Sequence, residues 1–263
     1  MTGTPVVVDR ADAVATITLN DPEHRNALTA ASKVALRDAV ADAADDERVR
    51  AVVLAGSART FCLGQDLVEH AKALAGGAER AFATVREHYT PIVRDLLTMP
   101  KPVIAAVGGT CVGAGLGLAL ACDHRVFATG VKLATAFAGI GLTFDTGLSV
   151  TLPRAVGDAR AKELVLFGRT FTAEEAIAWG ISGETVDADE VLPRALALAR
   201  KLSEGPTTAF AESKRLIGQA SGLSLDEALE AEAIGQVTCG STKDHAVAVA
   251  AFLDREVPVF TGR

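Results

Sequence analysis

Three loops between apolar segments carry the residues of this sequence that could do chemistry. They are His24–Leu28 (HRNAL), Phe61–Leu67 (FCLGQDL) and Gly141–Gly147 (GLTFDTG). In the second loop, Gly64 permits a turn that exposes the main-chain N–H of Gln65. In the third loop, Asp145 is a lone carboxylate between apolar residues. An exposed main-chain donor can stabilise a developing negative charge, and a carboxylate can transfer a proton.

Each of these loops also has an ordinary structural interpretation. Asn26 or Thr29 could cap the helix that follows, Asp66 lies near a helix start, and Asp145 could itself be a helix cap. If Asp145 is instead enclosed by apolar side chains, desolvation would raise its pKa towards the range useful in acid–base catalysis. The apolar side chains that could enclose it are Phe137, Leu142 and Phe144. The residues alone leave these interpretations open.

The longest apolar stretch, Pro102–Val126, organises the chain around it. It has no charged residue from Pro102 to Cys122, but its five glycines make a membrane span a poor interpretation, because glycine destabilises a helix interior. The pattern predicts a strand at Val103–Val107, a tight turn, and a helix whose first turn is free of bulk at Gly113–Gly115. Such a helix start offers unpaired N–H groups to a negative charge.

Two other interpretations of this stretch remain. The glycines could simply allow close packing of the helix on a sheet. A dinucleotide site is disfavoured, because the spacing is G-x-G-x-G rather than G-x-G-x-x-G and no acidic residue follows about 20 positions later.

The remaining periodicity predicts how these loops are supported. We expect a hairpin over 6–19, a helix from Thr29 to Ala44 with Val34, Leu36 and Val40 on or near one face, and a buried strand at 51–55. Further elements are expected as mostly helical residues at 67–99, a strand at 125–128, and helices at 148–156, 159–167 and 172–179. Strands that alternate with helices predict an α/β layer with parallel strands.

From Pro206 onward the pattern is entirely helical. Helices are expected at about 207–219, 224–239 and 242–256, the last opened by Ser241 with Asp244 at the third position. They have apolar stripes but no strands to cover, which is typical of a segment that packs on another subunit or back over its own active site. We therefore divide the chain into an α/β core with the active site (1–200) and a C-terminal helical region for oligomerisation and active-site cover (201–263).

Composition limits the function classes. The 263 residues are 49% apolar, and 33 acidic against 26 basic residues give a net charge of −7, so nucleic acid and anionic membrane surfaces are unsuitable partners. Four cysteines without metal or redox spacing indicate buried free thiols of a cytosolic protein. The histidines show no paired spacing, so we expect no metal site. An acidic residue by position 9 and the lack of a long apolar core argue against a signal peptide, so a cytoplasmic location is expected.

Taken in order, the motifs resemble the crotonase (enoyl-CoA hydratase/isomerase) superfamily over essentially the whole chain, and within it the 1,2-epoxyphenylacetyl-CoA isomerase group. The motifs that carry the likeness are HRNAL, FCLGQDL, MPKPVIAAVGGTCVGAGLGLALACDHRV, GIGLTFDTGLSVTLPRAVG and AFLDREVPVFTGR. The resemblance implies an α/β fold, the crotonase (ClpP-like) spiral of ββα units with a C-terminal helical trimerisation region. It also implies self-association as a homotrimer or a dimer of trimers.

The resemblance further implies roles for single residues. The N–H groups of Gln65 and Ala114 would hold the thioester carbonyl of an acyl-CoA, and Asp145 would be the acid and base. Residues implied to contact the substrate and its CoA part are Arg25, Ala27, Gln65, Asp66, Leu67, Gly113, Phe137 and Phe144. Coenzyme A is part of the substrate, so no separate cofactor is expected.

The sequence departs from the hydratases of this family at both glutamate positions, which carry Gly117 and Phe137. One carboxylate is enough to move a proton between two carbons of an enolate. We therefore expect an acyl-CoA isomerase, for a ring-epoxide aryl-acetyl-CoA or for conversion of a 3-enoyl-CoA to a 2-enoyl-CoA. The alternatives are a 2-enoyl-CoA hydratase and a catalytically silent member that binds acyl-CoA. Phe144 stands where the isomerases usually have proline.

Overall fold

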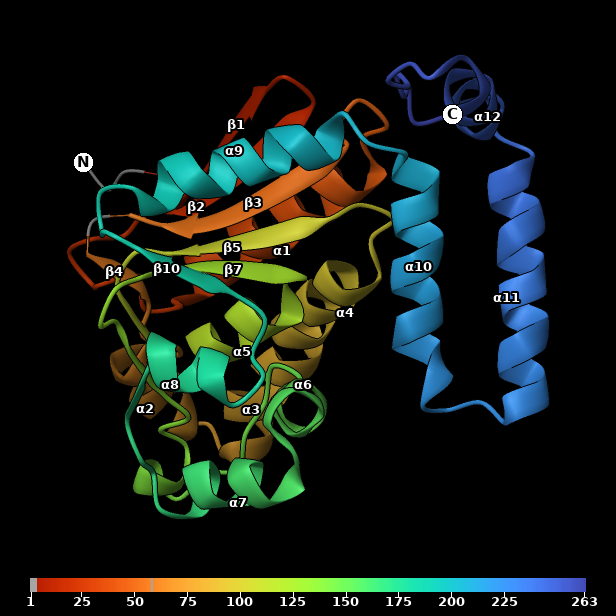
Figure 1. Ribbon diagram of the computed structural model, residues 1–263. Coiled ribbons are helices and arrows are strands. Elements are labelled where there is room, and N and C mark those ends of the chain that lie inside the picture. The colour runs from red at the N-terminus through yellow and green to blue at the C-terminus, as the bar shows by residue number, and fades with distance from the viewer. Residues whose placement is uncertain (1–3, 58) are drawn as a thin grey trace.

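Two β-sheets form the centre of the protein in the computed structural model, which describes residues 4–57 and 59–263 (Figure 1). The larger sheet has the order β1-β2-β3-β5-β7-β10 and the smaller one the order β4-β6-β8-β9. The strands are β1 (Val6–Ala11), β2 (Val14–Leu19), β3 (Ala51–Gly56), β4 (Thr60–Cys62), β5 (Val103–Val107), β6 (Thr110–Val112), β7 (His124–Ala128), β8 (Lys132–Ala134), β9 (Phe171–Thr172) and β10 (Glu184–Val186). Antiparallel pairing is confined to β1 with β2 and β8 with β9; the other neighbours are parallel.

The chain visits the two sheets alternately, which makes the path a spiral. The strands β3, β5 and β7 lie in the larger sheet, and the strand that follows each of them, β4, β6 or β8, lies in the smaller one. Because β4, β6 and β8 are parallel neighbours, their carboxyl ends gather at one edge. The loops that leave this edge contain Gln65, Ala114 and Phe137. The expected ββα spiral is confirmed, although the three-residue strands β4, β6 and β8 were not predicted.

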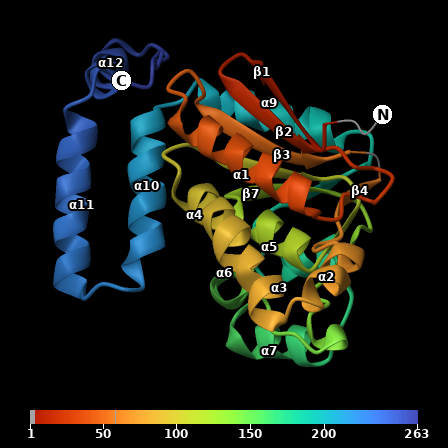
Figure 2. The same ribbon diagram turned by 180° about the vertical axis from the view of Figure 1, so that it is seen from behind.

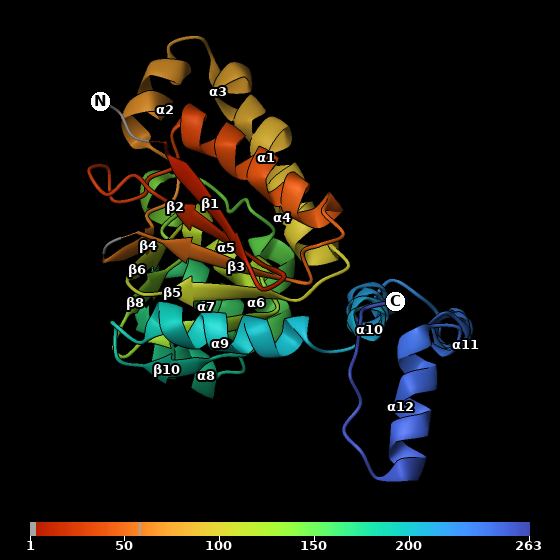
Figure 3. The ribbon, with the colours of Figure 1, turned by 90° about the horizontal axis from the view of Figure 1, so that it is seen from above.

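Helices cover both faces of the larger sheet. The helix α9 (Val191–Ser203) lies along one face, and α1 (Ala30–Asp45) lies along the other, as Figures 1 and 3 show. The helix α1 begins after Thr29, whose hydroxyl accepts a hydrogen bond from Ser32 N–H at 3.2 Å. Its buried face contains Lys33, whereas Val34, expected near that face, is exposed. The helix therefore places a lysine in the interior.

The remaining helices of the body surround the edge where the loops meet. They are α2 (Leu67–Leu74), α3 (Ala78–Thr84), a π-helical turn at Val85–Tyr89, α4 (Thr90–Thr98), α5 (Ala114–Ala121), a 3₁₀ turn at Ala138–Ile140, α6 (Leu148–Val156), α7 (Asp158–Leu166) and α8 (Ala173–Ala178). All eight residues of α5 are buried. A helix that is apolar all round belongs in a core, and among the described residues no helix is both long and apolar enough to cross a membrane. Cys62, Cys111 and Cys122 are buried free thiols, as predicted.

The C-terminal helices α10 (Thr207–Ala220), α11 (Leu225–Gly240) and α12 (Lys243–Asp254) stand away from the sheets (Figures 1 and 2). Lys214 of α10 ties this region to the body through a 2.9 Å ion pair with Asp123, which also accepts the N–H of Val103 at 2.8 Å. The helix α12 is capped by Thr242, whose hydroxyl accepts the N–H of His245, so the predicted cap at Ser241 was one residue early. Asp244 instead holds the chain end by accepting the N–H of Thr261 at 2.7 Å.

Candidate active site

Two loops from adjacent strands meet at Gly64, where their main chains are in contact. Gly64 has a φ of +80°, and a Cβ placed on it would lie 3.1 Å from the nitrogen of Ala114 and 3.1 Å from the carbonyl oxygen of Val112. The absence of a side chain therefore lets the main chain just before Gln65 lie against the main chain at Ala114. Gly113, with a φ of +58°, turns the second loop into α5.

The N–H groups of Gln65 and Ala114 are free to bind a ligand. A bridge to Leu28 uses the groups on either side of Gln65: Leu28 N–H donates to Gly64 O at 2.7 Å, and Asp66 N–H donates to Leu28 O at 3.2 Å. Neither Gln65 N–H nor Ala114 N–H donates to another residue within 4–57 and 59–263. Ala114 is the first residue of α5, so its N–H has no helical partner, and the helix start adds a favourable field for negative charge.

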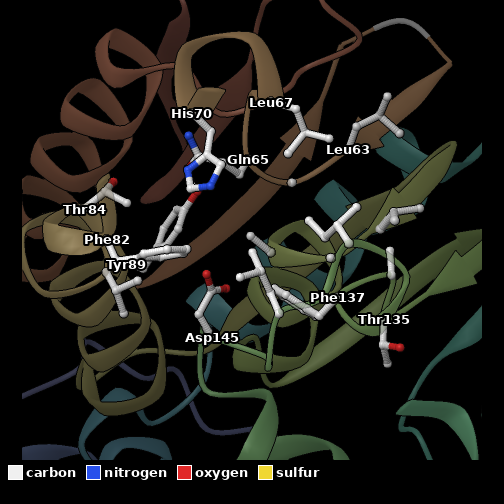
Figure 4. Close-up of a pocket in the computed structure, with 18 residues that line it drawn as sticks. Leu63, Gln65, Leu67, His70, Phe82, Thr84, Tyr89, Thr135, Phe137 and Asp145 are labelled. Carbon is white, nitrogen blue, oxygen red and sulfur yellow. The ribbon is translucent and has the colours of Figure 1, made fainter. Parts of the chain in front are cut away.

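A cavity of about 300 Å³ is lined by the residues that carry these two groups, and Figure 4 shows its wall. Gln65, Ala114 and Asp145 all line it, and its walls are otherwise mainly apolar. The apolar and aromatic side chains in the wall include Leu63, Leu67, Phe82, Val85, Tyr89, Phe137, Ile140 and Leu142. His70 stacks edge-on against Phe82 with 5.1 Å between ring centroids. Such a lining suits an apolar group with a few fixed polar contacts.

Asp145 is the carboxyl of this cavity. Its Oδ1 atom is buried and makes no hydrogen bond to another described residue. Burial, the largest effect, raises the pKa of Asp145 to about 6, so the group can gain and lose a proton near neutral pH. The side chain does not cap α6, whose preceding residue is Gly147. The enclosed environment predicted for Asp145 is thus present, and the capping interpretation is excluded.

Thr146 fixes the loop that carries Asp145. It has a φ of +49°, an uncommon conformation for a β-branched residue, and its side chain fills the space above Gly117. A Cβ on Gly117 would lie 1.9 Å from Thr146 Oγ1. Position 117 therefore cannot carry a larger side chain while this loop keeps its conformation. Backbone strain of this kind is concentrated at functional sites.

Comparison of this chain with known proteins shows its family. The family model of enoyl-CoA hydratase/isomerase matches residues 9–263. The 1,2-epoxyphenylacetyl-CoA isomerase of Escherichia coli (strain K12) is 37% identical over 95% of both chains. A Rhodobacter capsulatus protein named as an enoyl-CoA hydratase is 39% identical over 96% of both. The crystal structure of an enoyl-CoA hydratase from Bacillus anthracis covers 98% of this chain and 100% of its own, with a TM-score of 0.91 and 28% identity.

The chain belongs to the enoyl-CoA hydratase/isomerase family. It is therefore an enzyme of the crotonase fold, and an acyl-CoA substrate is consistent with its family. The predicted site residues Gln65, Leu67, Gly113, Ala114, Phe137 and Asp145 lie together in the cavity wall of this family member.

The other predicted residues lie outside that wall. Arg25 is exposed and has a φ of +54°, and Ala27 lies beside it. Asp66 caps α2 by accepting Glu69 N–H at 2.7 Å. Phe144 is partly buried and packs against the hydrophobic core, and it is not part of the cavity wall. Among the described residues, no cluster of three or more His, Cys, Asp or Glu side chains could hold a metal ion.

Sequence reasoning missed two side chains of the active site of this enoyl-CoA hydratase/isomerase family enzyme. The amide oxygen of Gln65 accepts hydrogen bonds from Lys33 Nζ at 3.1 Å and from the hydroxyl of Tyr89 at 2.5 Å. Lys33 is three residues before Leu36 on the buried face of α1. This spacing could have predicted the buried lysine, because Lys33 shares a helix face with buried apolar residues. A lysine in that position must have a partner in the interior.

We predict that Gly64→Ala lowers the turnover of any acyl-CoA substrate by at least about 100-fold, because the methyl group would press on Ala114 N and Val112 O and strain a left-handed residue. Steady-state kinetics on the folded variant would measure this. Gly108→Ala is the matched control, because its Cβ would meet no atom within 4 Å and its φ is not left-handed. Full activity in Gly64→Ala would contradict the assignment of these loops.

Proposed function

We propose that this enzyme is an acyl-CoA isomerase that works through a thioester enolate. The N–H groups of Gln65 and Ala114 bind the thioester oxygen, and Asp145 carries the proton. The substrates we propose are a 3-enoyl-CoA, converted to the 2-enoyl-CoA, or a ring-epoxide aryl-acetyl-CoA.

The proton transfer for a 3-enoyl-CoA balances with these groups alone. The carboxylate of Asp145 takes a proton from the α-carbon, and the electron pair of that C–H bond moves onto the thioester oxygen between the two N–H groups. When Asp145 returns the proton to the γ-carbon, the carbonyl forms again and the double bond lies between C2 and C3. Two fixed main-chain donors at a developing oxyanion stabilise such an intermediate without reorganisation.

The proposal rests on one observation above others: of the described residues in the cavity wall, Asp145 alone has a carboxyl. Hydration that uses two carboxylates to activate water needs a second one. The two positions where hydratases of this family carry glutamate are occupied by Gly117, covered by Thr146, and by the buried Phe137. A single carboxyl group is better suited to moving a proton between two carbons than to adding water across a double bond.

Two further findings support the choice of substrate. The E. coli relative is named as a 1,2-epoxyphenylacetyl-CoA isomerase, and the cavity of this chain has aromatic walls at Phe82, Tyr89 and Phe137. We place the CoA part along 24–28 and 65–68, which lie side by side at the Leu28–Gln65 bridge. The exposed Arg25 is suited to a CoA phosphate there.

We predict that the enzyme converts a 3-enoyl-CoA to the conjugated thioester and leaves crotonyl-CoA unhydrated. The ultraviolet absorbance of the conjugated thioester, followed with each substrate, measures both reactions. Asp145→Asn should abolish turnover and change acyl-CoA affinity by no more than a few fold, because it removes the base and keeps the shape. Rapid loss of the crotonyl-CoA absorbance would instead identify a hydratase, as the Rhodobacter capsulatus relative is named. Binding of acyl-CoA without turnover in the unaltered enzyme would identify a silent member.

We also propose that the enzyme assembles as a trimer or a dimer of trimers through α10–α12. A single chain leaves large apolar side chains of this region in solvent, with Phe252 at 82% and Ile217 at 78% exposed. Large apolar side chains exposed in one region favour burial against another copy.

We predict a trimer or hexamer in size-exclusion chromatography with light scattering, and a smaller species for Phe252→Asp, because a charge there opposes burial. Asp254→Asn, two residues further on at the end of α12, is a control that keeps the apolar surface. A monomeric unaltered protein would contradict the proposal.

A further inference from the structure

Lys33 is a buried cation with no ion-pair partner. Its exposed fraction is 4%, and among the described residues it makes no salt bridge. Its one side-chain hydrogen bond goes to the amide oxygen of Gln65, and its ammonium lies 5.6 Å from the ring centroid of Tyr89. Burial of an ammonium group without a carboxylate partner is costly, so the position calls for an explanation other than stability.

Its surroundings connect this charge to the reacting groups. The Gln65 amide, held by Lys33 and by the hydroxyl of Tyr89, belongs to a residue that lines the cavity and whose main-chain N–H has no partner among the described residues. Tyr89 is itself 1% exposed and lines the same cavity as Asp145. Tyr89 Oη adds no negative charge beside the ammonium, because burial raises its pKa and keeps the phenol neutral.

We propose that Lys33 is a positioning residue of this active site: its ammonium group holds Gln65 in place and supplies the positive charge that compensates the Asp145 carboxylate and the negative thioester oxygen. The proposal rests on the function proposed above for Gln65 and Asp145. It adds a fixed charge behind the two main-chain donors, where water is largely excluded and a charge acts strongly.

The other charged and titratable groups around the pair are few. Glu69 and Asp66 raise the pKa of Lys33, as Asp145 does, while burial has the larger effect and lowers it. His88, on the π-helical turn, has a pKa that is lowered by burial and then by Lys33. Cys62 adds to the raised pKa of Tyr89, and burial raises the pKa of its own thiol and keeps it protonated. Arg94 is exposed and lines a second cavity of about 340 Å³, which Asp145 also lines. Against the effect of burial, Thr146 and the main chain of Asp145 lower the pKa of Asp145, and Lys33 is the cation that lowers it further.

The test replaces Lys33 by Met, which keeps length and removes charge, and by Arg, which keeps charge. We expect Lys33→Met to lower kcat by roughly 10- to 100-fold with little change in KM, and to raise the pKa of Asp145 by about 0.5 to 1 unit. Lys33→Arg should restore the Asp145 titration. The pKa is read directly from carbon-13 NMR of labelled aspartate, with the Asp145 signal assigned by its loss in Asp145→Asn.

Lys101→Met is the matched control. Lys101 is also a buried lysine, 5% exposed, and its ammonium donates to the carbonyls of Ala43 and Asp46 at the other end of α1. This variant should lose stability but keep the kcat and the Asp145 titration of the unaltered enzyme. Equal effects of Lys33→Met and Lys101→Met, or an unchanged Asp145 titration in Lys33→Met, would overturn the proposal.

A reciprocal measurement serves if Lys33→Met does not fold. Because coupling between two titrating groups is mutual, Asp145→Asn should lower the pKa of Lys33, read from its labelled side chain, and an unchanged value would overturn the proposal. Both titrations are independent of turnover. An enzyme that proves not to be an isomerase therefore leaves this inference testable, and a failed titration leaves the isomerase proposal standing.

Discussion

The contact between two main chains at Gly64 is the constraint on which the active site depends. A side chain at this position would lie 3.1 Å from Ala114 N, so the loops after β4 and β6 could not approach as they do. The parallel strands β4 and β6 bring the two loops to one edge of the smaller sheet. Because Gly64 has no side chain, the main chains of the loops can then come into contact. The proposed chemistry uses main-chain N–H groups, and the lack of a side chain at Gly64 allows their loops to approach each other.

The same principle explains the loop of Asp145. Gly117 lacks a side chain, and Thr146, the residue after Asp145, enters the space above it. A larger residue at 117 would displace Thr146 and disturb the loop that carries Asp145.

The site also contains two ionisable side chains in the interior, Asp145 and Lys33. Lys33 is 4% exposed and the Oδ1 atom of Asp145 is buried, and neither side chain forms an ion pair among the described residues. Burial raises the pKa of the acid to about 6 and lowers that of the base. Such groups reduce stability, which the large apolar core around α5 and the larger sheet can tolerate. Their retention at one cavity is typical of a functional site.

The sequence predicted the parts of the site that depend on local chemistry. Gly64 before Gln65 indicated an exposed N–H, and the small residues around Ala114 indicated an open helix start; the structure has both. Of the three side chains predicted to enclose Asp145, Phe137 and Leu142 line its cavity, and Phe144 is not part of the cavity wall. Which side chains line a cavity depends on the conformation of its loops, and the spacing of residues along the chain does not determine that conformation.

The parts that were missed depend on tertiary contacts. The strands β4, β6 and β8 are three residues long, too short for an alternating pattern to be recognised. Lys33 lies on the buried face of α1 with Leu36 and Val40, which were assigned to that face, whereas Val34 is exposed. The partner of Lys33, Gln65, is 32 residues away in sequence. The fit of Thr146 over Gly117 likewise joins two segments that no local pattern connects.

The central claim is that one buried carboxylate, Asp145, carries the proton. The most direct measurement is the pH dependence of kcat/KM, which reports the titration of groups in the free enzyme. Since the carboxylate is the active base and burial raises its pKa to about 6, kcat/KM should fall tenfold per unit as the pH decreases below about 6. A value of kcat/KM that stays constant down to pH about 4, the usual range of an aspartate, would contradict the account.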